Sequence, residues 1–415
     1  MRPVTARHPA IRWGRCWIFF ATPDEGIYRT TAEDPRGSWS EPHLVKSGKG
    51  LIDPCPLWDE DGNAYLIHAY AGSRAGIKHR LRLCPMEPDG SNLIGEGQLV
   101  FHDPERHSTI EGPKLLKRDG WYYILAPAGG VKDGWQTVLR SRNIFGPYEP
   151  KVVLHQGSGV INGPHQGGLV DTGRGEWWFL HFQDVGVYGR VVHLQPVEWR
   201  DGWPIMGALN GADTPGQPVL SCRKPNLPAA RIAVPATSDE FSSSRLGLQW
   251  QWNANHSDKW YSLSARPGWL RLFALPVREL GHAPNLLLQK LPARRFTVET
   301  VLDVSGAKPG GYAGLVVIGA EHAALGLRRT ASGSEIRFGN TDDRVIANSK
   351  SRTLTLRITM NDGGLCDFSF SDRAGDWTTL PEKFQARPGV WIGAKVGLFS
   401  VGEGHADFDY FRFSV

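Results

Sequence analysis

Short runs of apolar and aromatic residues alternate with turns that contain glycine along the whole chain. In the first half, four runs rich in aromatic residues each begin at a glycine, at residues 14–21, 62–69, 120–127 and 175–182. A second apolar run precedes each of them, at residues 9–13, 55–58, 113–117 and 167–170. Each pair predicts a β-hairpin, because tight hairpin turns need the positive φ that glycine adopts readily.

These hairpins repeat at a nearly regular distance. The turn glycines are Gly14, Gly62, Gly120 and Gly175, which are 48, 58 and 55 residues apart. Further strand-like runs follow, at residues 26–30, 136–141 and 189–194. Several strands per unit at a period of about 50 residues indicate a β-propeller. An ordinary β-sandwich with chance similarity between its hairpins is the alternative.

The pattern changes after Gly207, so we expect two domains. Residues 1–207 form the predicted propeller, and residues 208–236, rich in Gly, Pro and Ala, read as a linker. Residues 237–415 contain many short runs with period-two alternation, which is typical of a β-sandwich. We find no segment with a convincing helical period, and the predicted fold class is all-β.

Composition narrows the function. The 47 basic and 42 acidic residues are spread along the chain, without the basic cluster that follows a phosphate backbone, so nucleic acid is not expected as a partner. No apolar run reaches the roughly 18 residues of a membrane helix. The five cysteines fit neither a disulfide framework nor a zinc pattern. Residues 1–8 lack the apolar core of a secretory signal, so the chain as it stands is expected to be cytoplasmic.

Three polar side chains recur at matching places in the repeat. Asp53 and Glu111 stand nine residues before their turn glycines, and His165 stands ten before its own. Radial repeats place such positions at similar radii, so we expect the three groups to converge at one mouth of the propeller channel. The alternatives are turn-capping carboxylates and a histidine bonded to the interior backbone.

The surrounding motifs resemble a known family. Residues 51–62, the Ile-Glu-Gly-Pro context of Glu111, the Gly-Pro-His-Gln-Gly context of His165 and residues 188–195 are similar to glycoside hydrolase family 43. The resemblance implies a five-bladed propeller that hydrolyses β-xylosides or α-L-arabinofuranosides with inversion. Residues 239–415 resemble the concanavalin-like sandwich of its β-xylosidases. The family resemblance as a whole implies a pentose-containing oligosaccharide from plant hemicellulose as the partner.

The resemblance also implies roles for individual residues. Glu111 matches the general acid, and Asp53 matches a carboxylate that orients this acid and modulates its pKa. Arg190 matches a substrate-binding arginine, with an ordinary ion pair as the alternative. His165 matches the central histidine, which contacts substrate or lies near a calcium ion in the channel. One imidazole does not make a calcium site, because calcium needs oxygen ligands.

One part of the family pattern has no counterpart here. The resemblance implies a general-base aspartate on the first blade, but residues 6–13 resemble the start of the second blade, and no acidic residue precedes Asp24. Asp24 and Glu25 do not match the motif of the base. We therefore expect four recognisable blades, with the first blade and the base absent. The alternative function is a catalytically inactive truncated product or carbohydrate-binding remnant.

Two further groups are expected to be structural. The tryptophans of the first half should mostly fill strand cores, while one or two line the sugar site; they are Trp13, Trp58, Trp121, Trp135, Trp177 and Trp178. In the sandwich, Asp239, Asp407 and Asp409 read as solvated acids at strand ends rather than as calcium ligands.

Overall fold

The computed structural model describes residues 11–209, 211, 214–339, 344–373 and 375–415. The chain divides into two compact units. Within the described residues, the first unit runs as far as Asp184 and again from Val191 to Ala229. The second unit comprises Val185–Arg190 and Ala230–Val415.

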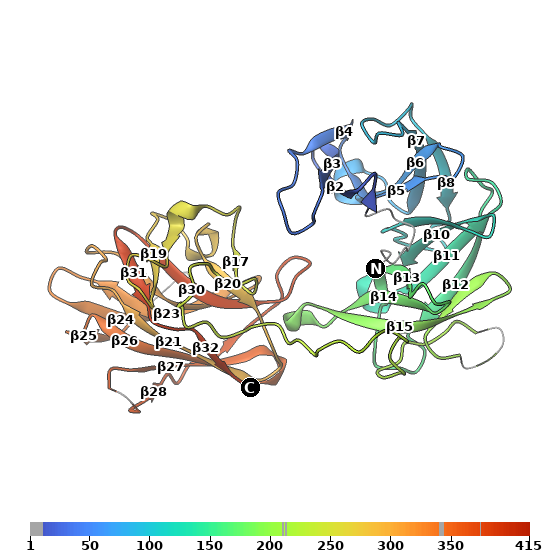
Figure 1. The fold of residues 1–415 in the computed structure, drawn as a ribbon. Helices are drawn as coiled ribbons and strands as arrows, with labels where there is room; N and C mark the ends of the chain where they lie inside the picture. Colours follow the sequence, from blue (N-terminus) through green and yellow to red (C-terminus); the bar gives the residue numbers. More distant parts are fainter. Residues whose placement is uncertain (1–10, 210, 212–213, 340–343, 374) are drawn as a thin grey trace. The chain divides into compact units, whose positions relative to one another are not determined.

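In its described residues, the first unit contains four antiparallel sheets of four strands each, arranged as four propeller blades (Figure 1). Blade 1 has β1 (Ile11–Arg12), β2 (Arg15–Thr22), β3 (Gly26–Ala32) and β4 (His43–Ser47). Blade 2 has β5 (Leu51–Trp58), β6 (Ala64–Tyr70), β7 (Arg80–Met86) and β8 (Gln98–His102). Blade 3 has β9 (Lys114–Arg118), β10 (Trp121–Ala128), β11 (Trp135–Ser141) and β12 (Glu149–His155). Blade 4 has β13 (His165–Asp171), β14 (Trp177–Asp184), β15 (Arg190–Arg200) and β16 (Trp203–Met206).

The predicted turn glycines join the first two strands of every blade. Trp13–Gly14 and Asp119–Gly120 are two-residue turns in which both residues have positive φ, 51° and 72° in the first turn and 51° and 71° in the second. This is the geometry of a type I′ hairpin, whose twist matches that of the flanking strands. The turns of blades 2 and 4 are longer, and their glycines also have positive φ, at Gly62 and Gly175.

Apolar clusters fill the three spaces between successive blades, so neighbouring blades pack against each other through buried apolar side chains. Within the described residues, one cluster joins blades 1 and 2 around Ile27 and Leu66, and another joins blades 2 and 3 around Leu83 and Ile124. A third cluster joins blades 3 and 4 around Phe179. Of the tryptophans expected in strand cores, Trp58 and Trp178 are buried, and Trp121, Trp135 and Trp177 are half-buried. The expectation is wrong for Trp13, which is 60% exposed because it occupies a hairpin turn.

The second unit is a β-sandwich of two antiparallel sheets. In strand order, the seven-stranded sheet has β17 (Gln251–Trp252), β20 (Leu287–Lys290), β30 (Lys395–Val401), β22 (Tyr312–Ile318), β23 (His322–Arg329), β24 (Ser334–Gly339) and β25 (Arg344–Ser349). The nine-stranded sheet has β18 (Tyr261–Ser262), β19 (Leu270–Phe273), β31 (His405–Phe408), β21 (Phe296–Asp303), β26 (Thr353–Met360), β27 (Leu365–Ser371) and β28 (Thr378–Thr379), with β29 (Phe384–Gln385) on β27 and β32 (Arg412–Ser414) on β21.

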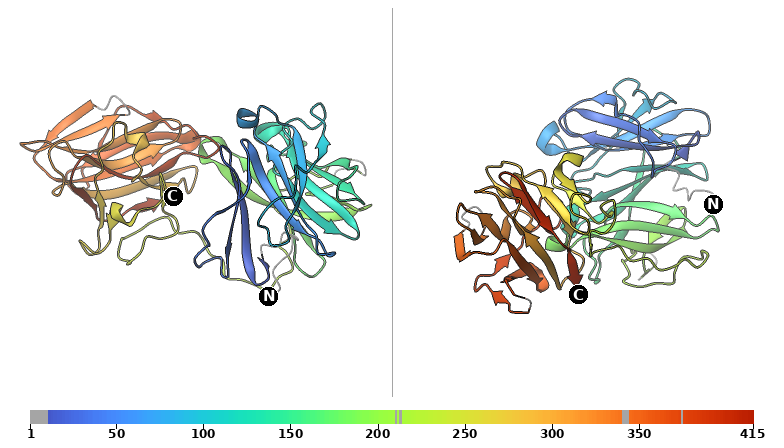
Figure 2. Two further views of the ribbon diagram at one scale, coloured as in Figure 1. Left: turned by 90° about the horizontal axis from the view of Figure 1, so that it is seen from above. Right: turned by 60° about the vertical axis from the view of Figure 1, so that its left-hand side comes forward.

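The predicted alternation builds the core of the sandwich. Burial alternates residue by residue along β21 and β26, and their inward side chains join one cluster that draws on both sheets. The all-β prediction is confirmed, since the described helices are single turns: α1 (Gly72–Ala75), α2 (Gly130–Asp133), η1 (Gly186–Tyr188), η2 (Asp258–Trp260), η3 (Leu280–His282) and η4 (Asp362–Gly364). Figure 2 shows these elements from two further directions. None of the described helices has the length and apolar character required to cross a membrane.

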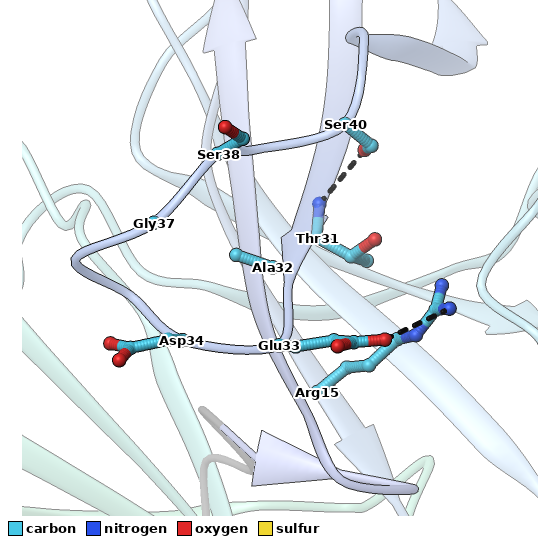
Figure 3. Close-up of a pocket in the computed structure, with 8 residues that line it drawn as sticks. All are labelled: Arg15, Thr31, Ala32, Glu33, Asp34, Gly37, Ser38 and Ser40. Carbon is cyan, nitrogen blue, oxygen red and sulfur yellow. Dashed lines mark hydrogen bonds and ion pairs between the residues drawn. The ribbon is translucent and has the colours of Figure 1, made fainter.

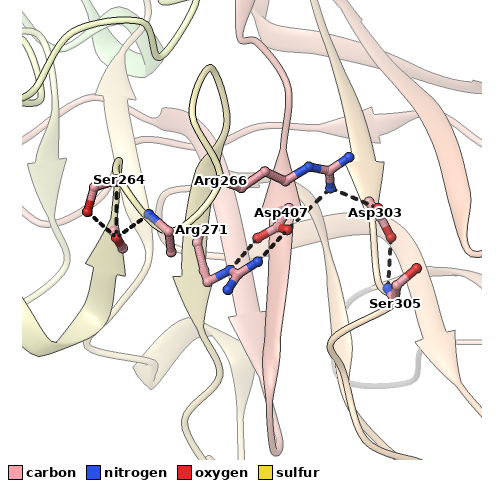
Figure 4. Close-up of polar contacts among 8 residues, drawn as sticks. Ser264, Arg266, Arg271, Asp303, Ser305 and Asp407 are labelled. Atoms are coloured by element: carbon pink, nitrogen blue, oxygen red, sulfur yellow. Dashed lines mark hydrogen bonds and ion pairs between the residues drawn. The ribbon is translucent and has the colours of Figure 1, made fainter.

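The acids of the sandwich differ from the expectation. Asp407 is 5% exposed, and its carboxylate receives two bonds from Arg271, at 2.8 and 3.0 Å, and a third from Arg266 at 3.2 Å (Figure 4). Arg266 also bonds Asp303 at 2.8 Å. Asp407 is therefore a buried ion-pair residue instead of a solvated strand-end acid. Asp239 accepts a bond from the indole Nε1 of Trp250 at 2.8 Å.

Candidate active site

In three neighbouring blades, a residue with positive φ lies near the start of the first strand. Asp53, Gly112 and Gln166 have positive φ values of 53°, 58° and 50°. A shift in strand register accompanies this conformation in blades 2 and 4, where one extra residue bulges from the inner strand. Glu111 and His165 each stand one residue before the left-handed position, whereas Asp53 occupies it. The three side chains are thus not at strictly equivalent positions. Counting back from the turn glycines did not reveal this one-residue difference.

Glu111 and His165 contact each other across two blades. The imidazole Nε2 of His165 lies 2.8 Å from the Oε1 atom of Glu111. The His165 side chain is only 1% exposed, whereas that of Glu111 is 28% exposed. The Glu111 backbone N–H donates to the Pro127 carbonyl of its own blade at 3.1 Å. The carboxylate is therefore anchored on a buried imidazole while part of it stays open to solvent.

Asp53 joins the same group from blade 2. Its Oδ2 atom accepts a bond from the backbone N–H of Gly112 at 2.9 Å and one from Nε2 of Gln166 at 3.4 Å. The carboxylate thus binds the residue after Glu111 and the residue after His165. The structure brings Asp53, Glu111 and His165 into one bonded cluster.

Gln166 is a member of this cluster that the sequence analysis missed. A β-carbon on Gly112 would lie 2.4 Å from Oε1 of Gln166, so only glycine fits there without displacing the amide. Its position beside His165 in the Gly-Pro-His-Gln-Gly motif was the available signal. Its role requires the fold, because the contact joins three blades.

Arg190 belongs to the other unit. It is the first residue of β15 and is exposed, and the segment Val185–Arg190 is part of the sandwich unit. Within that unit, the Tyr188 hydroxyl accepts a bond from the Gly363 N–H at 2.8 Å, and the Val187 carbonyl accepts one from the Ala394 N–H at 2.8 Å. The bonds described above link Asp53, Glu111 and His165, three of the four predicted site residues.

Comparison with known proteins identifies the family. Residues 11–204 match the family model described as "Glycosyl hydrolases family 43". Residues 238–414 match the family model described as "Beta xylosidase C-terminal Concanavalin A-like domain". A protein of Xylanibacter ruminicola named "Putative beta-xylosidase" is 41% identical over 399 residues, which cover 94% of this chain and 73% of that protein. The chain belongs to glycosyl hydrolase family 43.

Other family 43 proteins extend the match. A Bacteroides ovatus protein named "Non-reducing end alpha-L-arabinofuranosidase BoGH43B" is 26% identical, and the match covers 94% of this chain and 76% of that protein. The crystal structure of the family 43 protein BlXynB from Bacillus licheniformis has a TM-score of 0.79 at 25% identity, covering 99% of this chain and 84% of that one. The resemblance seen in the sequence and the propeller-plus-sandwich fold are confirmed.

None of the described residues is assigned as the general base that the family resemblance implies. Residues 6–10, part of the segment compared with the second blade of the family, lie outside the described residues. The Asp24 carboxylate pairs with Arg74 at 2.8 Å, and Glu25 accepts bonds from the hydroxyls of Thr22 and Tyr28. Asp24 is therefore paired with the β6–β7 segment of blade 2, Glu25 is bonded within blade 1, and the absence of the base stays a prediction.

The calcium ion implied by the family can be tested against the side chains present. Calcium takes about six to eight oxygen ligands. In the described part of the chain, no group of three or more His, Cys, Asp or Glu residues is placed to hold a metal ion. His165 already uses Nε2 for Glu111, and its buried Nδ1 has no hydrogen-bond partner among the described residues. These side chains do not fit direct calcium binding, and calcium in the channel stays a prediction.

Two further histidines occupy equivalent places, six residues after the turn glycines of blades 2 and 4. The Nδ1 atoms of His68 and His181 each lie 3.1 Å from the carbonyl of the next residue. Burial lowers the pKa of both side chains to about 4. Both side chains are therefore neutral at neutral pH, and their equivalent positions in the repeat were the signal for them.

A surface hollow of blade 1 lies apart from this cluster. It has a volume of about 420 Å³ and lies between the end of β3 and the loop that follows it (Figure 3). The Arg15 guanidinium and the Glu33 carboxylate lie 3.8 Å apart in its wall. None of Asp53, Glu111 and His165 lines it, so we do not assign the sugar to this hollow.

Proposed function

We propose that this family 43 protein hydrolyses terminal β-D-xylosyl or α-L-arabinofuranosyl linkages in hemicellulose oligosaccharides. The bonded cluster of Glu111, His165 and Asp53 is the observation that carries this proposal. The names of the relatives cover both pentosides, one being a putative β-xylosidase and another an α-L-arabinofuranosidase. Enzymatic activity is favoured over the inactive-remnant alternative by these names and by the intact cluster.

Glu111 is the proposed general acid. Hydrolysis needs a proton on the departing glycosidic oxygen, because an alkoxide is a poor leaving group. The bond from His165 occupies Oε1 of Glu111, which leaves Oε2 as the oxygen that can carry the transferred proton. The buried imidazole fixes the carboxyl group, so the proton is delivered from a defined direction.

Asp53 is the proposed orienting carboxylate. Its bond to the Gly112 N–H fixes the peptide that follows Glu111. Arg190 is proposed as a sugar contact because a guanidinium donates several hydrogen bonds in fixed directions to hydroxyl oxygens.

The proposed reaction is a single displacement with inversion, in which water attacks the anomeric carbon from the face opposite the acid. We assign no residue of this chain to the base that activates this water. Inversion is tested by ¹H NMR of the first product formed from a β-xyloside. The α-anomer of xylose should appear before mutarotation, and initial release of the β-anomer would contradict inversion.

Hydrolysis of 4-nitrophenyl β-D-xylopyranoside and of 4-nitrophenyl α-L-arabinofuranoside tests the function. We expect the wild type to release nitrophenol from at least one of them, and Glu111→Gln to reduce kcat by about 100-fold or more. Glu41→Gln, on an exposed glutamate, is the matched control and should keep the wild-type rate. A folded wild type that binds xylose or arabinose without hydrolysing either pentoside would support the carbohydrate-binding alternative instead.

A further inference from the structure

In three places, a loop of one blade bonds to the segment that leads into the inner strand of the next blade. Between blades 1 and 2, the Pro23 carbonyl accepts a bond from the Gly50 N–H at 2.6 Å. Between blades 3 and 4, the Lys132 carbonyl accepts a bond from the Asn162 side-chain amide at 2.8 Å. Both acceptors are backbone carbonyls, which do not titrate near neutral pH.

The junction between blades 2 and 3 uses a side chain instead. The β6–β7 loop presents His79, whose Nδ1 accepts a bond from the backbone N–H of Thr109. Thr109 stands two residues before Glu111. A backbone N–H can only donate, so this bond requires an unprotonated Nδ1, and protonation of the imidazole would remove the acceptor.

The segment held by this bond is in an unfavourable backbone conformation. Thr109 has a φ of 51°, a region that a β-branched residue rarely adopts, and His79 itself has a φ of 61°. On its other side, Ser108 accepts a bond from the Gly129 N–H at 2.6 Å, and the Glu111 N–H donates to Pro127. Among these contacts, only the one to His79 can be switched by a proton.

We propose that neutral His79 is a positioning residue for Glu111, and that its protonation releases Thr109 and thereby sets the acid limb of the activity. This inference rests on the proposed function of Glu111. The contact is present while His79 is neutral and is lost as the pH falls through the pKa of His79.

The surroundings of His79 extend the pH range over which its imidazole is neutral. Partial burial, and then the nearby Lys78 and His102, lower the pKa of His79 below its ordinary value. Lys78 lies on the same loop, and His102 ends β8 of the same blade. Both oppose a positive charge on His79, so the contact should survive to a more acidic pH than an isolated histidine would allow.

Two substitutions at position 79 distinguish the hydrogen-bond acceptor for the Thr109 N–H from the titratable imidazole. His79→Asn keeps an acceptor oxygen near the place of Nδ1, tolerates positive φ and does not titrate. His79→Gly tolerates the same φ but removes the acceptor. The matched control is His282→Asn, whose histidine is 81% exposed in the sandwich unit.

The pH dependence of kcat and KM for the better nitrophenyl pentoside tests the proposal. We expect His79→Gly to lower kcat by ~10-fold at neutral pH with KM nearly unchanged, because Glu111 loses its alignment. His79→Asn should keep the neutral rate and move the acid limb to lower pH, while His282→Asn matches the wild type. An unchanged acid limb in His79→Asn, or an unchanged kcat in His79→Gly, would overturn it.

A measurement without substrate keeps this inference separate from the proposed function. In amide NMR spectra of the full chain, the Thr109 resonance should shift with the pH as His79 titrates, and should lose this shift in His79→Asn. If the wild type hydrolyses neither pentoside but the Thr109 shift behaves as expected, the proposed function fails while the His79 switch stands. A Thr109 resonance that does not respond to the pH would overturn the switch.

Discussion

The Nε2 atom of His165 lies 2.8 Å from Oε1 of Glu111, and the two residues come from the entry segments of neighbouring blades. The histidine is buried and the glutamate is partly open, so the imidazole holds the carboxyl group from the interior side. The geometry of the proposed acid therefore depends on how blades 3 and 4 pack, as well as on its own loop.

Gly112→Ala should damage the site more than the fold. The new β-carbon would meet Oε1 of Gln166 at 2.4 Å and displace a side chain bonded to Asp53. We expect kcat on a nitrophenyl pentoside to fall by ~10-fold or more. Gly175→Ala is the matched control, because Gly175 also has positive φ but faces open space. It should share the stability cost of about 1 kcal/mol and keep its activity. Equal activities of the two variants would contradict this account.

Asp53→Asn separates charge from geometry. Asparagine tolerates the φ of 53° at this position and offers the Gly112 N–H an acceptor oxygen, so the fold should persist. The negative charge is lost, and we expect kcat to fall by ~10- to 100-fold at neutral pH. Measured kcat equal to the wild type would show that Asp53 acts only as a hydrogen-bond acceptor. Asp53→Ala, which removes both properties, should be worse than Asp53→Asn.

Acid should destabilise the propeller through its buried histidines. Burial lowers the pKa of His68 from 6.5 to about 4, so between these values the unfolded chain binds a proton that the folded chain excludes. The contribution of neutral His68 to the free energy of unfolding is fully present above pH 6.5. It is lost as the pH falls toward 4, and amounts to about 3 kcal/mol.

Thermal unfolding at pH 7.5 and 5.0 checks this prediction. The fall in Tm between the two pH values should be smaller in His68→Gln than in the wild type, even if the variant is less stable overall. His282→Asn, on an exposed side chain, should keep the wild-type difference. An unchanged difference in His68→Gln would show that His68 is not the group responsible.

Asp407→Asn should destabilise the sandwich. The substitution removes the negative charge that receives bonds from Arg271 and Arg266, and leaves their guanidinium groups in a largely buried setting. Breaking such a pair costs about 3 kcal/mol, and the partial exposure of Arg266 reduces this to about 2 kcal/mol. Denaturant unfolding of the full chain provides the measurement. Asp258→Asn, at a 92% exposed carboxylate, is the control, and equal stability of the two variants would contradict the assigned role of Asp407.

Much of the fold could be predicted from local pattern. Turn glycines such as Gly14 and Gly120 identify the hairpins because glycine, which has no β-carbon, adopts the positive φ of a tight turn without steric cost. Period-two alternation identifies sandwich strands such as β26 for a similar reason, since side chains alternate between the two faces of a sheet. Both signals are contained within a few neighbouring residues.

The site could be predicted only in part. The repeat and the family motifs predict that Asp53, Glu111 and His165 converge. They do not predict that Asp53 itself has the positive φ, whereas Glu111 and His165 each stand one residue before the position that has it. Gln166 was missed because its contacts cross three blades. The assignment of Arg190 to the sandwich unit and the burial of Asp407 likewise depend on chain segments that are far apart in the sequence.

The leaving-group dependence of the Glu111→Gln variant tests whether Glu111 is the general acid. A general acid matters most when the departing oxygen is strongly basic. On the pentosyl disaccharide that the wild type cleaves, Glu111→Gln should lose about 100-fold or more in kcat, whereas on the corresponding 2,4-dinitrophenyl pentoside the loss should stay below about 10-fold. Equal losses on the two substrates, or wild-type rates on both, would contradict the assignment of Glu111 as the acid.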